Sequence, residues 1–80
     1  MNDLSQKVRH IIGVHLGLAD DEVTEQMYLK DDLNADQLVL ADIAVSLEES
    51  FHIEITQEEL ENMNTVGDIV TYVSENLNEL

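Results

Sequence analysis

Residues 36–51 read DQLVLADIAVSLEESF, and this stretch decides the fold. Asp36 is a good N-cap for a helix, because its carboxylate accepts hydrogen bonds from the free backbone N–H groups and meets the positive end of the helix dipole. At about 100° per residue, apolar side chains then fall on one side of the helix. This stripe consists of Leu40, Ile43, Ala44, Leu47 and Phe51. The pattern predicts an amphipathic helix over residues 37–50 with one buried face.

The opposite side of the same helix is not uniformly polar. Leu38 and Val45 project about 140–160° away from the buried stripe. Apolar anchors framed by carboxylates are typical of a docking surface for another protein. Because single exposed apolar residues are common, an ordinary solvent-exposed face is the alternative. We define the outer face as Leu38, Ala41, Asp42, Val45, Glu48 and Glu49.

The charge balance restricts the partners. Three Lys+Arg against 18 Asp+Glu give a formal net charge of -15, which argues against nucleic acid and anionic membranes as partners. Asp31, Asp32 and Asp36 add negative charge next to the outer face, so we expect partners with basic patches. The same charge disfavours self-association at low salt, and we expect a monomer.

Length and composition predict a small cytoplasmic domain. The chain has 80 residues and no cysteine, which suits a single domain over residues 1–80 in a reducing compartment. No apolar run approaches the roughly 18 residues of a membrane span. The N-terminus has no apolar stretch of the kind found in signal peptides.

The N-terminal part predicts a helix followed by a long loop. Apolar residues at helical spacing favour a helix over about residues 3–16, with Gly17 as its C-cap and Gly13 inside it, either closely packed or merely tolerated. Residues 18–35 are irregular and longer than usual connections. Apolar residues recur through this loop and should anchor it on the core: Val23, Met27, Leu29 and Leu33.

The C-terminal part predicts two more helices. Residues 52–55 alternate polar and apolar side chains but have no partner strand, so we interpret them as an extended connector. Thr56 and Glu59 form a capping box that opens a short helix, and Thr65 caps a last one. With no proline and no credible strand pair, the chain is predicted to be all-α, a small bundle of three long helices and one short helix.

Blocks of the sequence resemble the acyl carrier protein family in order and spacing over nearly the whole chain. These blocks are VRHIIG (8–13), LG (16–17), EVT (22–24), DDLNADQL (31–38), LEESFHIEI (47–55) and TVGD (65–68). The resemblance implies a four-helix bundle whose second helix docks basic enzymes of fatty acid or polyketide-type synthesis. It also implies a core that opens around a fatty chain between the second and third helices.

Position 37 departs from that family at the residue that defines its activity. In the family, the serine of an Asp-Ser-Leu triplet is esterified to 4′-phosphopantetheine, and the attachment needs a hydroxyl that can be deprotonated. Asp36 and Leu38 match this triplet, but Gln37 carries a carboxamide, whose nitrogen lone pair is delocalised. The remaining serines lack the setting of the motif: Ser5, Ser46, Ser50 and Ser74. We therefore expect no 4′-phosphopantetheine on this chain.

Two neighbouring positions also differ from the family. Val39 replaces a residue that is usually acidic, and Asn34 replaces the usual glycine at a position where asparagine tolerates positive φ. Loss of both a nucleophile and a contact charge favours natural divergence over an engineered substitution.

Two functional hypotheses follow from this resemblance. In the first, the chain is a non-carrier interaction module that binds partner enzymes through the outer face. In the alternative, it is a genuine acyl carrier protein whose attachment serine is substituted in this sequence. Restoring a serine at position 37 distinguishes the two, because only a preserved recognition surface supports loading.

A metal site or a catalytic role has little support in the sequence. Asp32, Asn34 and Asp36 begin like an EF-hand loop, but its sixth and twelfth positions are Gln37 and Ile43 instead of glycine and glutamate. The histidines are not spaced as helical metal ligands: His10, His15 and His52. We interpret the aromatic residues as packing residues: Tyr28, Phe51 and Tyr72. We expect no enzymatic activity and no bound metal.

Overall fold

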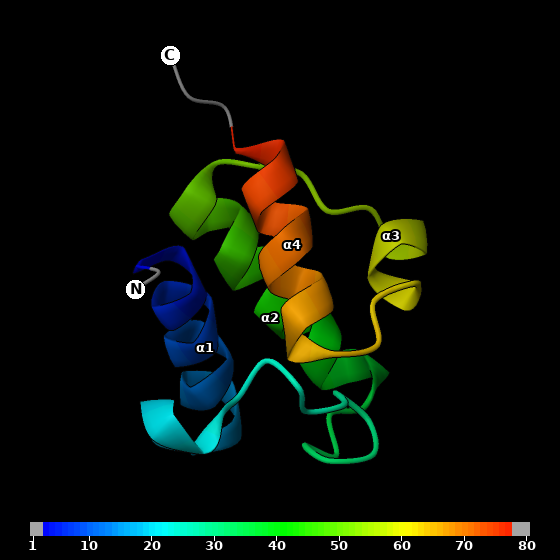
Figure 1. The fold of residues 1–80 in the computed structure, drawn as a ribbon. Helices are drawn as coiled ribbons and strands as arrows, with labels where there is room; N and C mark the ends of the chain where they lie inside the picture. The colour runs from blue at the N-terminus through cyan, green and yellow to red at the C-terminus, as the bar shows by residue number, and fades with distance from the viewer. Residues whose placement is uncertain (1–2, 78–80) are drawn as a thin grey trace.

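The computed structural model describes residues 3–77 and shows an all-α fold (Figure 1). Its elements are α1 (Asp3–Leu16), the 3-10 helix η1 (Asp20–Glu22), α2 (Gln37–Phe51), α3 (Gln57–Glu61) and α4 (Val66–Asn76). Within the described residues, β geometry is limited to one isolated bridge between Tyr28 and Thr65. The predicted bundle of three long helices and one short helix is therefore confirmed, and only η1 was not predicted.

The helices begin and end at the residues that their capping chemistry favours. The Asp36 carboxylate accepts a hydrogen bond from the Val39 N–H at 2.9 Å and starts α2. This helix runs one residue beyond the predicted range, and His52 ends it in the left-handed conformation with φ 57°. Thr56 forms the predicted capping box with Glu59 at the start of α3, and Thr65 caps α4 as predicted and also forms a capping box with Asp68.

Both glycines near the end of α1 have the structural roles expected of them. Gly17 adopts a φ of 72°, which a residue with a Cβ rarely takes. A Cβ on Gly13 would lie 2.7 Å from the Leu18 carbonyl oxygen, and the Leu18 N–H donates to the Gly13 carbonyl at 2.9 Å. Gly13 therefore lets the chain fold back closely against α1.

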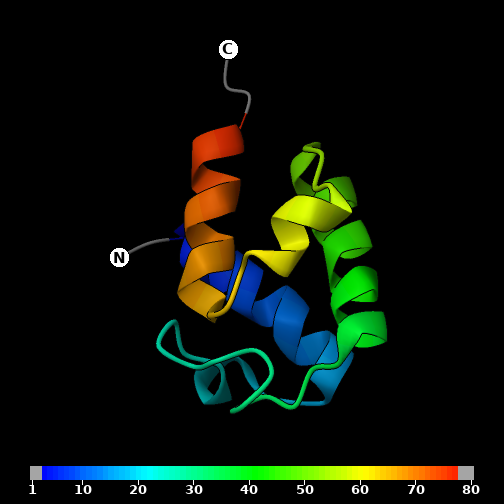
Figure 2. The same cartoon turned by 90° about the vertical axis from the view of Figure 1, so that its right-hand side faces the viewer.

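The loop between η1 and α2 is anchored on the core, as predicted. Val23 and Leu29 are almost fully buried. Main-chain hydrogen bonds also tie the loop to the start of α4, with Val66 N–H donating to Met27 O at 3.0 Å and Gly67 N–H donating to Glu25 O at 2.9 Å. The loop runs beneath the start of α4 (Figure 2) and leads to α2 in a fixed position.

The core lies where α1, α2 and α4 meet. α1 packs against both α2 and α4, and α3 packs against α2. The buried positions of α2 match the predicted stripe at Leu40, Ile43, Ala44 and Leu47, and α4 buries Val66, Ile69, Val70 and Val73. Phe51 and Tyr72 are partly buried against this core. The packing role expected for Tyr28 was wrong, because its side chain is 52% exposed.

No helix within residues 3–77 has both the length and the apolar character needed to cross a membrane.

Candidate functional site

The start of α2 presents Gln37 on a rigid support. Asn34 takes the positive φ of 57° that its side chain tolerates. Ala35 is buried, and its N–H donates to the Leu29 carbonyl at 2.8 Å, so the chain is fixed just before the helix. Asp36 caps the helix and Gln37 is its exposed first residue. The family's attachment position is therefore exposed and held in place.

The structure gathers the outer face on the solvent side of α2. Leu38 is 75% exposed and Val45 is 51% exposed, although both are large apolar side chains. Ala41, Asp42 and Glu49 are exposed beside them. Exposed apolar groups of this size within a carboxylate rim have the composition of a protein-binding patch.

Glu48 differs from the other residues predicted for the outer face. Its side chain is half-buried, and Oε2 accepts a hydrogen bond from the Ile55 N–H at 2.8 Å. This contact holds the connector between α2 and α3 against α2. This contact could not be predicted from the sequence, because the two residues belong to different elements and helical periodicity describes only local neighbours.

Val39 does not lie on the exposed surface where an acidic residue could contact a partner. It is half-buried and packs against the core. The side chain is therefore turned partly away from the solvent surface that Leu38 and Val45 share, and packing explains a valine at this position.

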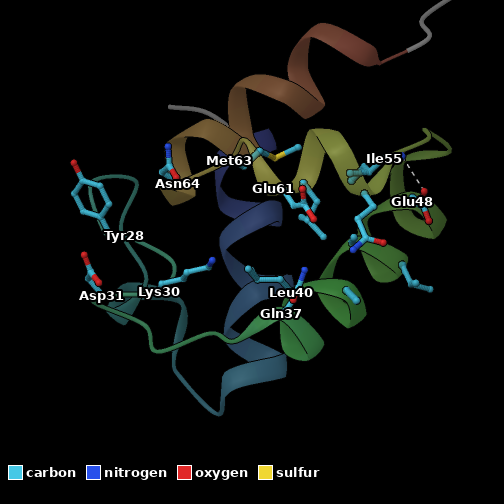
Figure 3. Close-up of a pocket in the computed structure, with 15 residues that line it drawn as sticks. Tyr28, Lys30, Asp31, Gln37, Leu40, Glu48, Ile55, Glu61, Met63 and Asn64 are labelled. Carbon is cyan, nitrogen blue, oxygen red and sulfur yellow. Dashed lines mark hydrogen bonds between the residues drawn. The ribbon is translucent and has the colours of Figure 1, made fainter.

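A groove of about 540 Å³ lies between α2 and α3 and opens beside Gln37 (Figure 3). Its apolar lining comes from α2, α3 and the segments next to α3: Leu40, Ala44, Ile55, Leu60 and Met63. Polar side chains surround the mouth, among them Lys30, Gln37, Glu61 and Asn64. Its size and mixed lining are those of a small-molecule site. The contributions of Lys30 and Met63 were not predicted, because they come from a loop and a connector without periodic pattern.

The groove and the outer face are continuous. Ala41, Val45 and Glu48 belong to the outer face and also line the groove. A partner that covers the outer face would therefore lie over one edge of the groove as well.

The side chains at the attachment position do not fit covalently bound 4′-phosphopantetheine. Gln37 offers a carboxamide, which donates and accepts hydrogen bonds but supplies no hydroxyl nucleophile. Ser5 is buried and donates to the Glu25 carboxylate, while Ser46 bonds His15 Nε2 at 2.8 Å. Ser50 and Ser74 lie on α2 near its end and on α4, away from Asp36.

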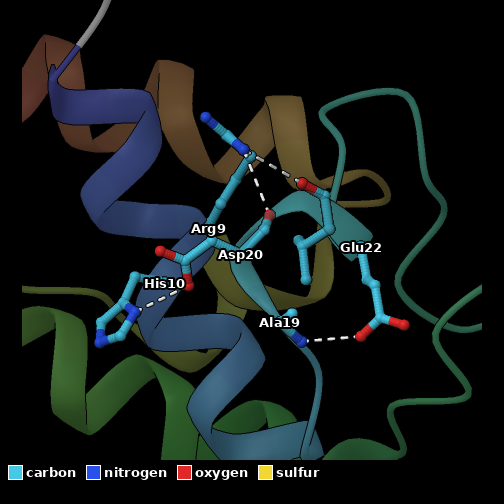
Figure 4. A network of polar contacts seen from close by, with 6 residues as sticks. Arg9, His10, Ala19, Asp20 and Glu22 are labelled. Carbon is cyan, nitrogen blue, oxygen red and sulfur yellow. Dashed lines mark hydrogen bonds and ion pairs between the residues drawn. The ribbon is translucent and has the colours of Figure 1, made fainter.

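The basic side chains of α1 are engaged within the fold. Arg9 donates to the carbonyls of Asp20 at 3.3 Å and Val23 at 3.4 Å, and His10 Nδ1 lies 2.8 Å from Asp20 Oδ1 (Figure 4). The Lys7 ammonium lies 5.5 Å from the centre of the Phe51 ring. None of these contacts of Lys7, Arg9 and His10 involves a carboxylate of the outer face.

The carboxylates of the stretch that resembles the start of an EF-hand loop accept hydrogen bonds from backbone N–H groups instead. Asp32 Oδ2 accepts a hydrogen bond from the Tyr28 N–H at 2.7 Å, and Asp36 Oδ1 accepts one from the Val39 N–H at 2.9 Å. Among residues 3–77, no group of three or more His, Cys, Asp or Glu side chains is arranged to hold a metal ion.

A second polar cluster connects α3 and α4. The Tyr72 hydroxyl lies 2.7 Å from both the Glu54 carbonyl oxygen and Glu59 Oε1. Burial, the bond to Glu59 and nearby carboxylates raise the pKa of Tyr72 to about 12. Hydrogen bonds from Tyr72 and Thr56 lower the pKa of Glu59. The capping role of Glu59 was predicted, but the Tyr72 contact was not, since the two residues are far apart in sequence.

The start of α4 has a similar carboxylate. The N–H groups of Asn64 and Thr65 donate to Asp68 at 2.9 and 3.1 Å and lower the pKa of its carboxyl. Asp68 lies in the first turn of α4, where a carboxylate also meets the positive end of the helix dipole.

Comparison with known proteins identifies similar sequences and structures. Residues 6–73 match the family model described as "Phosphopantetheine attachment site". The acyl carrier protein of Thermotoga maritima is 40% identical over 75 residues, which cover 94% of this chain and 93% of that protein.

Two solved structures have the same fold over most of both chains. The acyl carrier protein of Enterococcus faecalis is 40% identical with a TM-score of 0.76, and the match covers 92% of this chain and 94% of that chain. A Mycobacterium tuberculosis protein assigned to the acyl carrier proteins is 32% identical with a TM-score of 0.83, over 90% of this chain and 96% of that chain.

Proposed function

The chain belongs to the acyl carrier protein family of phosphopantetheine-attachment domains, and from that premise we propose that it acts as a docking domain without the prosthetic group. Members of this family are carrier domains and not catalysts. The function of such a domain lies in which proteins it binds and in what it carries to them.

The chemistry of position 37 supports the first half of this proposal. The position is exposed and backed by an intact N-cap, so a transferase has access to it. Gln37 nevertheless has no hydroxyl to attack the pyrophosphate of coenzyme A. The chain as it stands therefore carries no 4′-phosphopantetheine.

The outer face supports the second half, and it is the observation that carries the proposal. Leu38 and Val45 remain exposed although neither contributes to the core, and Asp42 and Glu49 lie beside them. Such a patch suits an apolar pocket bordered by Lys and Arg on a carrier-protein-dependent enzyme. We infer that the chain is a cytoplasmic monomer that binds such enzymes and competes with loaded carriers for them.

Charge reversal on the outer face tests the docking proposal. Asp42→Lys and Glu49→Lys should each weaken binding to a carrier-protein-dependent synthase about threefold to tenfold, because each replaces an attractive contact with a repulsive one. The loss should shrink in high salt, because salt screens exposed charges. Binding is measured by titration calorimetry at low and high ionic strength.

Glu75→Lys provides the matched control, because Glu75 is exposed on α4 outside the outer face and the substitution changes the net charge equally. It should alter binding much less than the α2 variants. Equal losses for all three variants, or losses that do not respond to salt, would contradict docking through the outer face.

A genuine carrier with a substituted serine is the alternative, and the preserved geometry of position 37 favours it specifically. Asn34, Asp36 and the groove beside Gln37 retain the arrangement that a serine would need. If this alternative holds, Gln37→Ser restores loading and the groove receives the carried chain. If the chain is a docking domain only, the variant folds but stays unmodified.

A further inference from the structure

α3 is a short helix without a buried residue. It has five residues, and it packs against α2. A helix this short has little intrinsic stability. Nevertheless it supplies Gln57, Leu60 and Glu61 to one wall of the groove. The contacts that hold α3 in place therefore determine how far the groove opens.

Polar contacts hold α3 and its preceding connector from two sides. From α2, Glu48 Oε2 accepts a hydrogen bond from the Ile55 N–H at 2.8 Å. From α4, the Tyr72 hydroxyl reaches both the Glu54 carbonyl and the Glu59 carboxylate at 2.7 Å. The single hydroxyl proton is shared between these two acceptors.

The Tyr72 contact acts on Glu59, which belongs to the capping box in the first turn of α3. Glu59 Oε1 also accepts hydrogen bonds from the N–H and hydroxyl of Thr56, both at 3.0 Å, and so completes the capping box. Hydrogen bonds to a charged acceptor are the stronger kind. One hydroxyl on α4 thus supports both the connector and the first turn of α3.

We propose that Tyr72 is a latch that ties α3 and its connector to α4 and so fixes the wall of the groove that α3 supplies. When the hydroxyl contact breaks, α3 and the connector are released from α4 and this wall of the groove becomes mobile, while α1, α2 and α4 keep their shared core. The latch depends on the contacts of Tyr72 and not on Gln37, so it is independent of whether the chain carries a prosthetic group.

Amide hydrogen exchange of Tyr72→Phe tests the latch, because this variant removes one oxygen atom and keeps the ring. Exchange in residues 55–63 should become about tenfold faster, whereas exchange in α1 and in the buried part of α4 should change less than about twofold. A neutral apolar dye, N-phenyl-1-naphthylamine, should also enter the groove several-fold faster. Glu59→Gln, which keeps the shape of the acceptor but removes its charge, should change both measurements in the same direction.

Tyr28→Phe is the matched control. Tyr28 also lines the groove, and among the described residues no hydrogen bond involves its hydroxyl. This variant should leave exchange in residues 55–63 unchanged. Val8→Ala, a core variant, supplies the pattern of global destabilisation, in which all helices lose protection together. The latch is wrong if Tyr72→Phe gives that global pattern, or if its exchange and dye entry match those of Tyr28→Phe.

Discussion

Gly13 shows how one missing side chain shapes the N-terminal half of the molecule. The Leu18 main chain folds back over α1 at this position and is hydrogen-bonded to the Gly13 carbonyl. The same fold-back brings η1 within reach of Arg9 and His10. A glycine inside a helix normally costs about 1 kcal/mol relative to alanine, so close packing is what compensates for it here.

Gly13→Ala should therefore destabilise the protein although alanine is the better helix former. The new Cβ would lie 2.7 Å from a main-chain oxygen, which cannot move without displacing the turn. We expect the free energy of unfolding to fall by about 1–2 kcal/mol, as measured by urea denaturation. Gln6→Ala on the exposed side of α1 is the control and should change stability little. An increase in stability for Gly13→Ala would contradict the close-packing account.

At the scale of the element, α2 divides its surface among three tasks. Leu40, Ile43 and Leu47 belong to the core. Ala44 and Glu48 line the groove, and Leu38, Asp42 and Glu49 of the outer face are left to solvent. The separation follows from helical periodicity, which places residues three, four and seven apart on one side. Stability and docking should therefore be separable by substitution within this one helix.

A pair of leucine truncations on α2 tests this separation. Leu47→Ala should cost about 2–5 kcal/mol in the free energy of unfolding, because Leu47 is 1% exposed and its loss leaves a cavity. Leu38→Ala should change stability by less than about 0.5 kcal/mol and should weaken partner binding. Thermal unfolding and titration calorimetry measure the two effects. A large loss of stability in Leu38→Ala would mean that the exposed leucine serves the fold.

For the whole molecule, the net charge of -15 on 80 residues sets a self-repulsion that the core must overcome. Within residues 3–77, the one ion pair with opposed side-chain charges is His10 with Asp20, and it requires a protonated histidine. Most carboxylates therefore face solvent or cap the backbone, and their mutual repulsion is offset only by screening.

Salt should accordingly stabilise the protein. Raising the concentration of sodium chloride from 10 mM to 500 mM shortens the Debye length from about 30 Å to a few ångströms and screens this repulsion. We expect the melting temperature to rise by several degrees over this range. Potassium chloride at equal ionic strength is the control and should act equally, since screening does not depend on the identity of the ion. A melting temperature that does not depend on salt would contradict the account.

The sequence was most informative where a contact is local. Helical stripes, the caps at Asp36, Thr56 and Thr65, and the left-handed conformation of Gly17 all depend on near neighbours, and each was predicted correctly. The exposure of the outer face followed from the same periodicity. The flanking residues Asp36 and Leu38 pointed to Gln37 as the position that corresponds to the family's attachment serine, and its role stays a prediction.

Contacts between distant segments could not be predicted from patterns among near neighbours. The bonds from Glu48 to Ile55 and from Tyr72 to Glu54 depend on how the connector crosses the bundle. Tyr28 was wrongly expected to pack, because a tyrosine in an irregular loop has no periodic pattern to show which way it faces. These contacts depend on the tertiary arrangement, which composition and residue spacing do not predict.

The most direct test of the central claim is the intact mass of the native chain and of Gln37→Ser after incubation with coenzyme A, magnesium and a broad-specificity phosphopantetheinyl transferase. If the chain is a docking domain that cannot be loaded, the native chain keeps its mass, because Gln37 offers no nucleophile. A gain of the 4′-phosphopantetheine mass by Gln37→Ser would show that the surrounding recognition surface is intact and would support the carrier alternative. A gain of that mass by the native chain would contradict the account.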